Sequence, residues 1–187
     1  MKVNLARTLA RSEANGPGTR FVVWVQGCPL ACPGCWNPDT WPFERRQLRL
    51  VSDLAAEILG TAGIEGVTFT GGEPFAQAGP LAELAEVLRH HGLSVFIFTG
   101  YRVAELDSPS QQKLLALADG LVAGRYVSDL RTTDARWRGS TNQTMYGIAN
   151  SQQAGGPGPS SEIVIAADGA LAMTGFPADV LVAAFAD

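Results

Sequence analysis

GCPLACPGCWNP, residues 27–38, holds all three cysteines of this 187-residue chain. A buried structural cysteine packs like a small hydrophobe, whereas the prolines and glycines of this stretch predict a turn-rich loop. The spacing Cys28-x3-Cys32-x2-Cys35 is therefore typical of thiolates that hold a metal centre or carry out redox chemistry. Pro33-Gly34 has the sequence of a tight turn, which would fold Cys32 and Cys35 toward each other and aim backbone amides at their sulfurs.

The cysteine loop offers three thiolates and no obvious fourth ligand, and this number limits which metal centre the loop can hold. A structural zinc site needs four protein ligands. The chain's two histidines, His90 and His91, lie far along the sequence at an expected helix end, where the helix dipole explains them without a metal. An iron–sulfur cubane normally has four cysteine ligands, so a cubane held by three would keep one iron open to a substrate. We therefore expect an iron–sulfur cluster, and a zinc or redox loop remains the alternative that the same triplet allows.

Composition and charge describe a single globular unit. The length fits one domain with a sizeable core, and a net charge of -4 gives no electrostatic reason to expect nucleic acid as a partner. The first residues contain no apolar run of signal-peptide length, and no segment approaches the ~20 apolar residues of a membrane helix. We expect a cytoplasmic protein without a nucleic-acid or membrane partner. In that reducing compartment an odd number of clustered cysteines argues against disulfides.

Apolar runs alternate with segments of helical periodicity along the chain. Strands are expected at 21–25, 67–70, 94–98 and around Leu121 and Val122, and helices beginning at Ser52, at Pro80 and at Ser108 or Ser110. This alternation predicts an α/β protein with a parallel sheet and right-handed crossovers. Such sheets carry their chemistry at the carboxyl ends of the strands. The cysteine loop, GGEP (71–74) and FTGY (98–101) all fall at such ends.

The composition changes after residue 150. SQQAGGPGPSS, residues 151–161, predicts a flexible linker, and EIVIAADGALAMTGFP, residues 162–177, predicts two strands joined at Asp168-Gly169. We expect residues 1–150 to form the core domain. Residues 151–187 are interpreted as a linker and a C-terminal β-hairpin appended to the main sheet, and not as a second domain.

The cysteine triplet after a first strand resembles the signature of the radical S-adenosylmethionine (radical SAM) superfamily. TGGEP, residues 70–74, is similar to that superfamily's glycine-rich loop for the ammonium group of S-adenosylmethionine (SAM), although an ordinary β-to-α turn fits GGEP alone. Glycines let the backbone approach a ligand closely, and Glu73 can accept from a cation. The resemblance implies a [4Fe-4S] cluster on Cys28, Cys32 and Cys35, with SAM chelating the fourth iron. It also implies a partial (βα) barrel with a mostly parallel sheet.

Further blocks resemble the activating proteins of anaerobic ribonucleotide reductase and, more broadly, the glycyl-radical-enzyme activases. These blocks are NGPGTRFVVWVQGC (15–28), CPGCWNPDTW (32–41), FTGY (98–101), LADGLVAGRY (117–126) and RGSTNQ (138–143). Carried over by position, the resemblance assigns cofactor contacts to Gly34, Trp36, Gly71, Gly72, Glu73, Thr99 and Arg125. The chain departs from the family at Ala123, where an acidic residue is usual, and at Thr144, where a basic residue is frequent.

The resemblance implies that a flavodoxin or ferredoxin reduces the cluster, and that SAM is then cleaved to a 5'-deoxyadenosyl radical. The first hypothesis is an activase that takes the α-hydrogen of a glycine in a partner glycyl radical enzyme. The second is a radical SAM maturase or small-molecule enzyme, similar to the compact 7-carboxy-7-deazaguanine synthases, which the departures at Ala123 and Thr144 keep open. The third is a non-catalytic iron–sulfur electron-transfer or sensor protein, which would leave Glu73 without a role. No second cysteine group exists, so the sequence excludes auxiliary clusters.

Overall fold

The computed structural model describes residues 1–147, 161–165, 168–169 and 171–184. The strands are β1 (Lys2–Ser12), β2 (Arg20–Val25), β3 (Gln47–Leu50), β4 (Gly66–Gly71), β5 (Ser94–Thr99), β6 (Gly120–Ala123), β7 (Thr144–Gly147), β8 (Ser161–Ile165) and β9 (Leu171–Gly175). The helices are α1 (Val51–Leu59), α2 (Ala78–His90), α3 (Pro109–Leu117) and α4 (Asp179–Ala184), and the short 3-10 turns are η1 (Pro38–Thr40), η2 (Pro74–Gln77), η3 (Val103–Glu105) and η4 (Ser128–Leu130). Within these ranges, no helix is both long and apolar enough to cross a bilayer.

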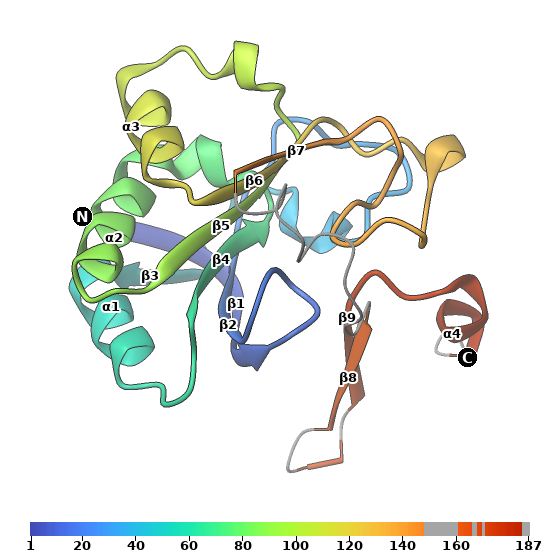
Figure 1. Ribbon diagram of the computed structural model, residues 1–187, viewed down its shortest axis with the longest axis horizontal. Helices are drawn as coiled ribbons and strands as arrows, with labels where there is room; N and C mark the ends of the chain where they lie inside the picture. The colour runs from blue at the N-terminus through green and yellow to red at the C-terminus, as the bar shows by residue number, and fades with distance from the viewer. Residues whose placement is uncertain (148–160, 166–167, 170, 185–187) are drawn as a thin grey trace.

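A seven-stranded sheet in the order β3-β1-β2-β4-β5-β6-β7 forms the centre of the protein (Figure 1). Its strands β2, β4, β5 and β6 are parallel, which confirms the expected α/β class. Every residue of β2 is buried, as expected for a parallel strand covered on both faces. The register pairs Val25 with Gly71 and Thr99 with Ala123, so the carboxyl ends of these strands share one edge.

The sequence did not predict the antiparallel strands β1, β3 and β7. Two register shifts interrupt β1, and each shift breaks the two-residue alternation by which a strand is recognised. Strands β3 and β7 have four residues each and hold their place mainly by backbone pairing, since most of their side chains are exposed. The sheet is thus mostly parallel, as expected, and the antiparallel strands at its two ends are an addition that the sequence did not indicate.

The helix starts were predicted with mixed success. Ser108 is the N-cap of α3 and forms a capping box with Gln111. This confirms the first of the two proposed start positions, Ser108 and Ser110. Ser52, in contrast, lies inside α1, whose N-cap is Leu50 without a side-chain hydrogen bond. Pro80 is the third residue of α2 and not its first, because η2 runs directly into the helix.

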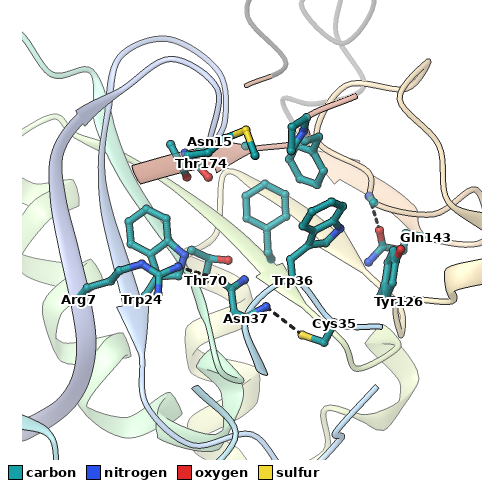
Figure 2. Close-up of a pocket in the computed structure, with 16 residues that line it drawn as sticks. Arg7, Asn15, Trp24, Cys35, Trp36, Asn37, Thr70, Tyr126, Gln143 and Thr174 are labelled. Atoms are coloured by element: carbon teal, nitrogen blue, oxygen red, sulfur yellow. Dashed lines mark hydrogen bonds between the residues drawn. The ribbon is translucent and has the colours of Figure 1, made fainter. Parts of the chain in front are cut away.

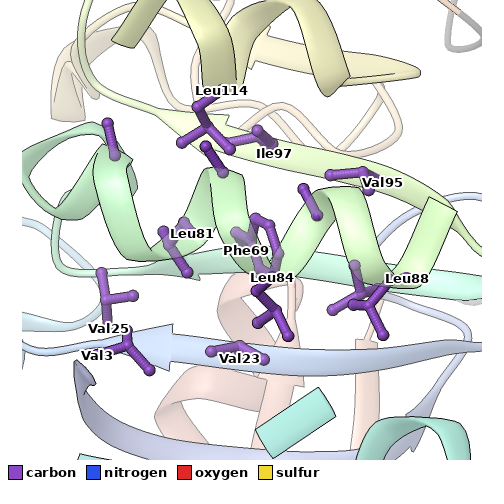
Figure 3. Packing of buried hydrophobic residues seen from close by; sticks show 14 of the residues in the cluster. Val3, Val23, Val25, Phe69, Leu81, Leu84, Leu88, Val95, Ile97 and Leu114 are labelled. Atoms are coloured by element: carbon purple, nitrogen blue, oxygen red, sulfur yellow. The ribbon is translucent and has the colours of Figure 1, made fainter. Parts of the chain in front are cut away.

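Helices α1, α2 and α3 cover one face of the sheet, which we call the helix face (Figure 1). Figure 3 shows α2 lying along the sheet, with Leu81, Leu84 and Leu88 turned toward Val23 and Phe69. All five side chains are fully buried. Burial of each such side chain contributes roughly 1.5–3 kcal/mol, so this helical stripe is a main source of stability.

The opposite side of the sheet, the open face, carries the alternate residues of the same strands. Phe96 and Val122 pack there against Trp137 from the loop before β7. Strands β8 and β9 pair antiparallel in a two-stranded sheet of their own, separate from the seven-stranded one, and lie on this side together with α4 (Figure 1). Residues 151–160 of the linker expected at 151–161 lie outside the described residues, and Ser161 is the first residue of β8.

Few but specific contacts join the C-terminal strands to the open face. The Glu162 carboxylate accepts hydrogen bonds from the Ser12 hydroxyl and from the backbone N–H of Glu13. The ring of Phe176 lies 5.8 Å from that of Phe98, centroid to centroid. These contacts place β8 and the residue after β9 against the open face of the sheet.

Arg20 shows what the NGPGTR block does in the fold. Its guanidinium is buried at the amino-terminal edge of the sheet and donates to Ser94 Oγ (2.7 Å), Ser94 O (2.9 Å), Val67 O (2.7 Å) and Pro17 O (3.1 Å). Burial lowers its pKa to about 10, so the group stays charged at neutral pH. One side chain thus joins three neighbouring strand beginnings, far from the cysteine loop.

Replacing Arg20 by methionine is expected to lower the free energy of unfolding by about 2–3 kcal/mol, because buried carbonyls lose their donors. Urea denaturation followed by circular dichroism measures this loss. Arg11→Met, at an exposed position, is the matched control and should change stability by less than ~0.5 kcal/mol. Equal stability of the two variants would contradict the structural role of Arg20.

Candidate functional site

The cysteine loop begins where β2 ends and contains the tight turn that its sequence predicts. The backbone N–H of Cys35 donates to Cys32 O (3.1 Å), and Gly34 has a φ of +75°. Pro then Gly with positive φ at the two central positions is the pattern of a type II turn. The N–H of Asn37 reaches Cys35 Sγ at 3.4 Å. The turn thus brings a backbone amide to one of the sulfurs, as expected.

All three thiols are free, partly buried, and line a single cavity of about 120 Å³ at the carboxyl edge of the sheet. No three His, Cys, Asp or Glu side chains among the described residues stand close enough to bind one metal ion. This spacing does not suit tetrahedral zinc, whose ligands must all reach the same ion. A cubane has a separate iron for each cysteine, so its ligands stand around the cluster and need not converge.

Burial raises the pKa of the Cys28 and Cys32 thiols. At neutral pH these groups are therefore protonated, because even an unperturbed cysteine has a pKa near 8.5. A bound metal centre reverses this balance and deprotonates a coordinating thiol outright. Loading of a cluster into this loop should consequently release protons.

His90 and His91 take no part in this cavity. They lie at the end of α2, which leads to the start of β5 and hence to the amino-terminal edge of the sheet. The Nδ1 atom of His91 lies 2.8 Å from Val87 O one helical turn earlier. The structure thus separates the histidines from the cysteines, as their expected position at a helix end indicated.

The Gly-Gly-Glu loop at the end of β4 packs directly on the cysteine loop. The N–H groups of Gly72 and Glu73 donate to Val25 O (2.8 Å) and Gly27 O (2.9 Å). A Cβ atom on Gly72 would stand 2.4 Å from Gly27 O, so no larger residue fits without movement of the backbone. The sequence predicted close approach to a ligand, and the structure shows that the first close neighbour is the cysteine loop itself.

The Glu73 carboxylate joins this loop to the end of β5. Its side chain is 1% exposed. Oε1 accepts from Phe75 N (2.9 Å) and Thr99 Oγ1 (2.8 Å), and Oε2 accepts from Gly100 N (2.9 Å). Burial raises the pKa of Glu73 to about 7, against the opposing effect of these donors. A carboxylate has about four acceptor positions, so one remains for a further donor such as a cation.

Thr99 and Arg125, both predicted to contact a cofactor, have different surroundings. Thr99 lines the thiol cavity, but its hydroxyl donates to Glu73 and accepts from Tyr101 N (3.1 Å). Arg125 donates to Glu105 Oε2 at 2.6 Å, and this bond lowers the pKa of Glu105 to about 2. Arg125 lines a neighbouring groove that also includes Thr144, and it is not among the residues that line the thiol cavity.

A second cavity, of about 230 Å³, adjoins the first on the open face of the sheet (Figure 2). Cys35, Thr70, Phe98, Tyr126 and Gln143 line both cavities. Trp36 lines the second cavity and is 38% exposed. The wall opposite the sheet includes Thr174 and Phe176, from β9 and the residue after it.

Several lining residues were not singled out from the sequence. Arg7 lies on β1, a strand that was not predicted, and its guanidinium carbon is 4.8 Å from the centre of the Trp24 ring. Arg7 Nη2 also donates to Asn37 Oδ1 (2.6 Å), beside the cysteine loop (Figure 2). Tyr126 and Gln143 belong to the blocks 117–126 and 138–143, so the family resemblance had pointed to these two segments without naming the two residues. Nothing in the sequence pointed to Arg7.

Comparison with known proteins gives consistent matches. A family model described as a 4Fe-4S single cluster domain matches residues 14–146, which include the cysteine loop and the Gly-Gly-Glu loop and end before β8. Three proteins named anaerobic ribonucleoside-triphosphate reductase-activating protein are similar to the chain. The one from Salmonella typhi is 35% identical over 143 residues, covering 71% of this chain and 90% of the relative. The one from Escherichia coli K12 is 33% identical over 140 residues with the same coverage. The one from Enterobacteria phage T4 is 33% identical over 152 residues, covering 77% and 94%.

Among solved structures, the crystal structure of QueE from Escherichia coli is similar to this chain. The identity is 22%, the TM-score is 0.45, and the superposition covers 54% of this chain and 53% of that one.

Proposed function

This chain belongs to the family of anaerobic ribonucleoside-triphosphate reductase-activating proteins, and on that premise we propose that it generates a glycyl radical on a partner reductase. It is a radical SAM enzyme with a [4Fe-4S] cluster and SAM as cofactors. The observation that carries the proposal is the convergence of three free cysteines and the Gly-Gly-Glu loop on one cavity. The proposed electron donor is a flavodoxin or ferredoxin.

Cys28, Cys32 and Cys35 are the proposed ligands of three irons, and the fourth iron is the proposed site of SAM chelation. This assignment is supported by the turn at Pro33-Gly34 and by the backbone N–H that reaches Cys35 Sγ. A cluster held by these cysteines would pass one electron from the reductant to SAM, whose S–C5' bond would break to give methionine and a 5'-deoxyadenosyl radical. The chain's own residues hold the cluster, orient the cofactor beside it and restrict the access of water.

The proposed SAM contacts divide between the two cavities. Gly71, Gly72 and Glu73, which line the thiol cavity, are proposed to contact the amino end of the methionine moiety, and the Thr99 hydroxyl would hold the Glu73 carboxylate in place. The second cavity, with aromatic walls and the polar side chains of Thr70 and Asn15, suits a nucleoside. Trp36 is proposed to contact the cofactor in this second cavity. Gly34 is proposed to lie against the cofactor as well, in the turn that precedes Trp36. Arg125 is proposed to act through its charge at the edge of the thiol cavity, where it opposes the rise in the pKa of Cys32.

The proposal is tested with the reconstituted protein under anaerobic conditions. With dithionite and SAM we expect 5'-deoxyadenosine, and with the anaerobic reductase of the same organism we expect a glycyl radical doublet by electron paramagnetic resonance. Each radical should be accompanied by one 5'-deoxyadenosine, because the glycine α-hydrogen ends on that product. Product without any protein radical would contradict activation and favour the second candidate, and no product at all would favour an electron carrier.

A second candidate is a radical SAM enzyme that acts on a peptide or small molecule enclosed by the C-terminal strands. The observation in its favour is that Thr174 and Phe176, which lie beyond the matched range 14–146, form a wall of the second cavity. The departures at Ala123 and Thr144 line the neighbouring groove and also favour a different substrate. The radical measurement described above separates the two candidates.

We further infer that the sheet is a partial (βα) barrel with residues 1–150 as the radical SAM core. Support comes from the four parallel strands and from the packing of α1, α2 and α3 on one face of the sheet. Residues 151–187 are proposed to be a linker and β-hairpin extension of the same domain. The contacts of Glu162 with Ser12 and Glu13 support this assignment.

A further inference from the structure

Trp41 carries a buried hydrogen-bond donor that the fold leaves without an acceptor. Its side chain lines the thiol cavity, directly after η1. Its indole Nε1 is buried and has no hydrogen-bond partner among the described residues. A buried N–H without an acceptor destabilises the fold, so native proteins seldom keep one without a reason. A group bound in the cavity is the natural acceptor.

The backbone fixes Trp41 against the first cysteine. Trp41 O accepts from Cys28 N (3.0 Å), and Thr40 O accepts from Gly27 N (2.8 Å). The Gln26 side chain donates to Pro42 O at 2.7 Å on the other side of the tryptophan. Residues 40–42 are thus tied to residues 26–28 at three successive points. The backbone of Trp41 is therefore held beside the backbone of Cys28.

Other side chains of the thiol cavity already use their donors within the protein. The Thr99 hydroxyl donates to Glu73, and Gln143 Nε2 donates to Gly124 O (2.9 Å). Trp137 also has a buried Nε1 without a partner among the described residues, but it packs beside Phe96 and does not line the cavity. Trp41 Nε1 is therefore a donor that is fully buried, has no partner among the described residues, and belongs to a side chain of the cavity wall.

We propose that the Trp41 indole N–H donates a hydrogen bond to a sulfur of the [4Fe-4S] cluster, either an inorganic sulfide or the Cys28 thiolate. This inference rests on the cysteine ligands proposed above. Reduction adds negative charge to the cluster, and a donor at a sulfur stabilises the more negative state. Trp41 is thus a positioning residue that raises the reduction potential and makes the cluster easier to reduce.

The test compares Trp41→Phe with Trp137→Phe, since both variants remove one indole N–H and keep an aromatic ring. The midpoint potential of each cluster is measured by redox titration with electron paramagnetic resonance, without SAM. In Trp41→Phe the ratio of reduced to oxidised cluster at a fixed potential should fall about tenfold, equivalent to ~59 mV for a one-electron couple. Trp137→Phe should keep the potential of the unaltered protein. Equal potentials in all three proteins would overturn the inference.

A second measurement needs no variant and decides the matter even where Trp41→Phe fails to assemble a cluster. The unaltered protein is labelled with ¹⁵N at the indole of tryptophan, and its reduced cluster is examined by hyperfine spectroscopy. We expect coupling to one indole nitrogen and to its exchangeable proton. A cluster of normal iron and sulfide content without this coupling would overturn the role of Trp41 alone. Absence of any cluster would overturn the ligand assignment and, with it, this inference.

Discussion

Replacing Cys32 by alanine is expected to remove the [4Fe-4S] cluster and to reduce 5'-deoxyadenosine formation to background. Loss of a supporting contact to a metal ligand costs 10–100-fold, so loss of a ligand itself should cost more than ~100-fold. The fold should survive, because Cys32 is only partly buried and lies in a loop outside the hydrophobic core. Iron and sulfide content, the absorbance of the cluster, and product formation under anaerobic conditions measure the effect.

The neighbouring Pro33 provides the matched control. It is exposed and adjoins Cys32, and Pro33→Ala keeps all three thiols. The turn is closed by a backbone hydrogen bond from Cys35 to Cys32, so this variant should still bind a cluster. A Cys32→Ala protein that retains a cluster and cleaves SAM would show that the three-cysteine assignment is incorrect. Purified protein that binds one zinc ion and no iron would contradict it as well.

Local features of this site were predictable because their causes lie within a few residues. The turn at Cys32–Cys35 follows from Pro33-Gly34, which preset the required backbone angles. The strand before the cysteine loop follows from FVVWV, residues 21–25, because an unbroken apolar run suits a strand that is covered on both faces. Sequence alone therefore located the cysteine loop at the end of a strand.

Features that depend on distant partners could not be predicted in the same way. Glu73 was expected to meet a cation, but its carboxylate is first bound by Gly100 N and Thr99, whose positions depend on the pairing of β4 with β5. Arg20 was assigned to a family block, yet its role depends on Ser94, which lies 74 positions further along the chain. Long-range pairing of this kind has no local signal, and neither residue could be given its partners from the sequence.

Glu73→Gln is expected to weaken both the fold around the site and the binding of SAM. An amide has one oxygen and one NH2 group, whereas the Glu73 carboxylate accepts from Phe75 N, Thr99 Oγ1 and Gly100 N. If the amide oxygen serves Phe75 and Thr99, its NH2 group faces the N–H of Gly100. Two opposed donors at a buried site should cost about 1–3 kcal/mol of stability. Loss of the negative charge should also lower the affinity for SAM by about tenfold or more, which corresponds to ~1.4 kcal/mol.

The pKa of Glu73 sets the sign of two pH effects. Burial raises it from its ordinary value of 4.5 to about 7, so the fold favours the protonated carboxyl. This contribution to stability is complete below pH 4.5 and is lost as the pH rises to about 7, at up to ~1.4 kcal/mol per pH unit. Binding of the SAM ammonium group, in contrast, needs the deprotonated, negatively charged form of Glu73. The affinity for SAM should therefore rise as the pH increases through about 7 and then level off.

Calorimetric titration of SAM into the cluster-loaded protein between about pH 6 and 8 checks this dependence. The unaltered protein should show the rise in affinity, and Glu73→Gln should show a lower affinity that is nearly constant across the range. Glu86→Gln is the control, because Glu86 is exposed on α2 and pairs with Lys113, away from both cavities. It should bind SAM as the unaltered protein does. A Glu73→Gln protein with native affinity at every pH would mean that the buried carboxylate neither attracts the cofactor nor positions the loop that holds it.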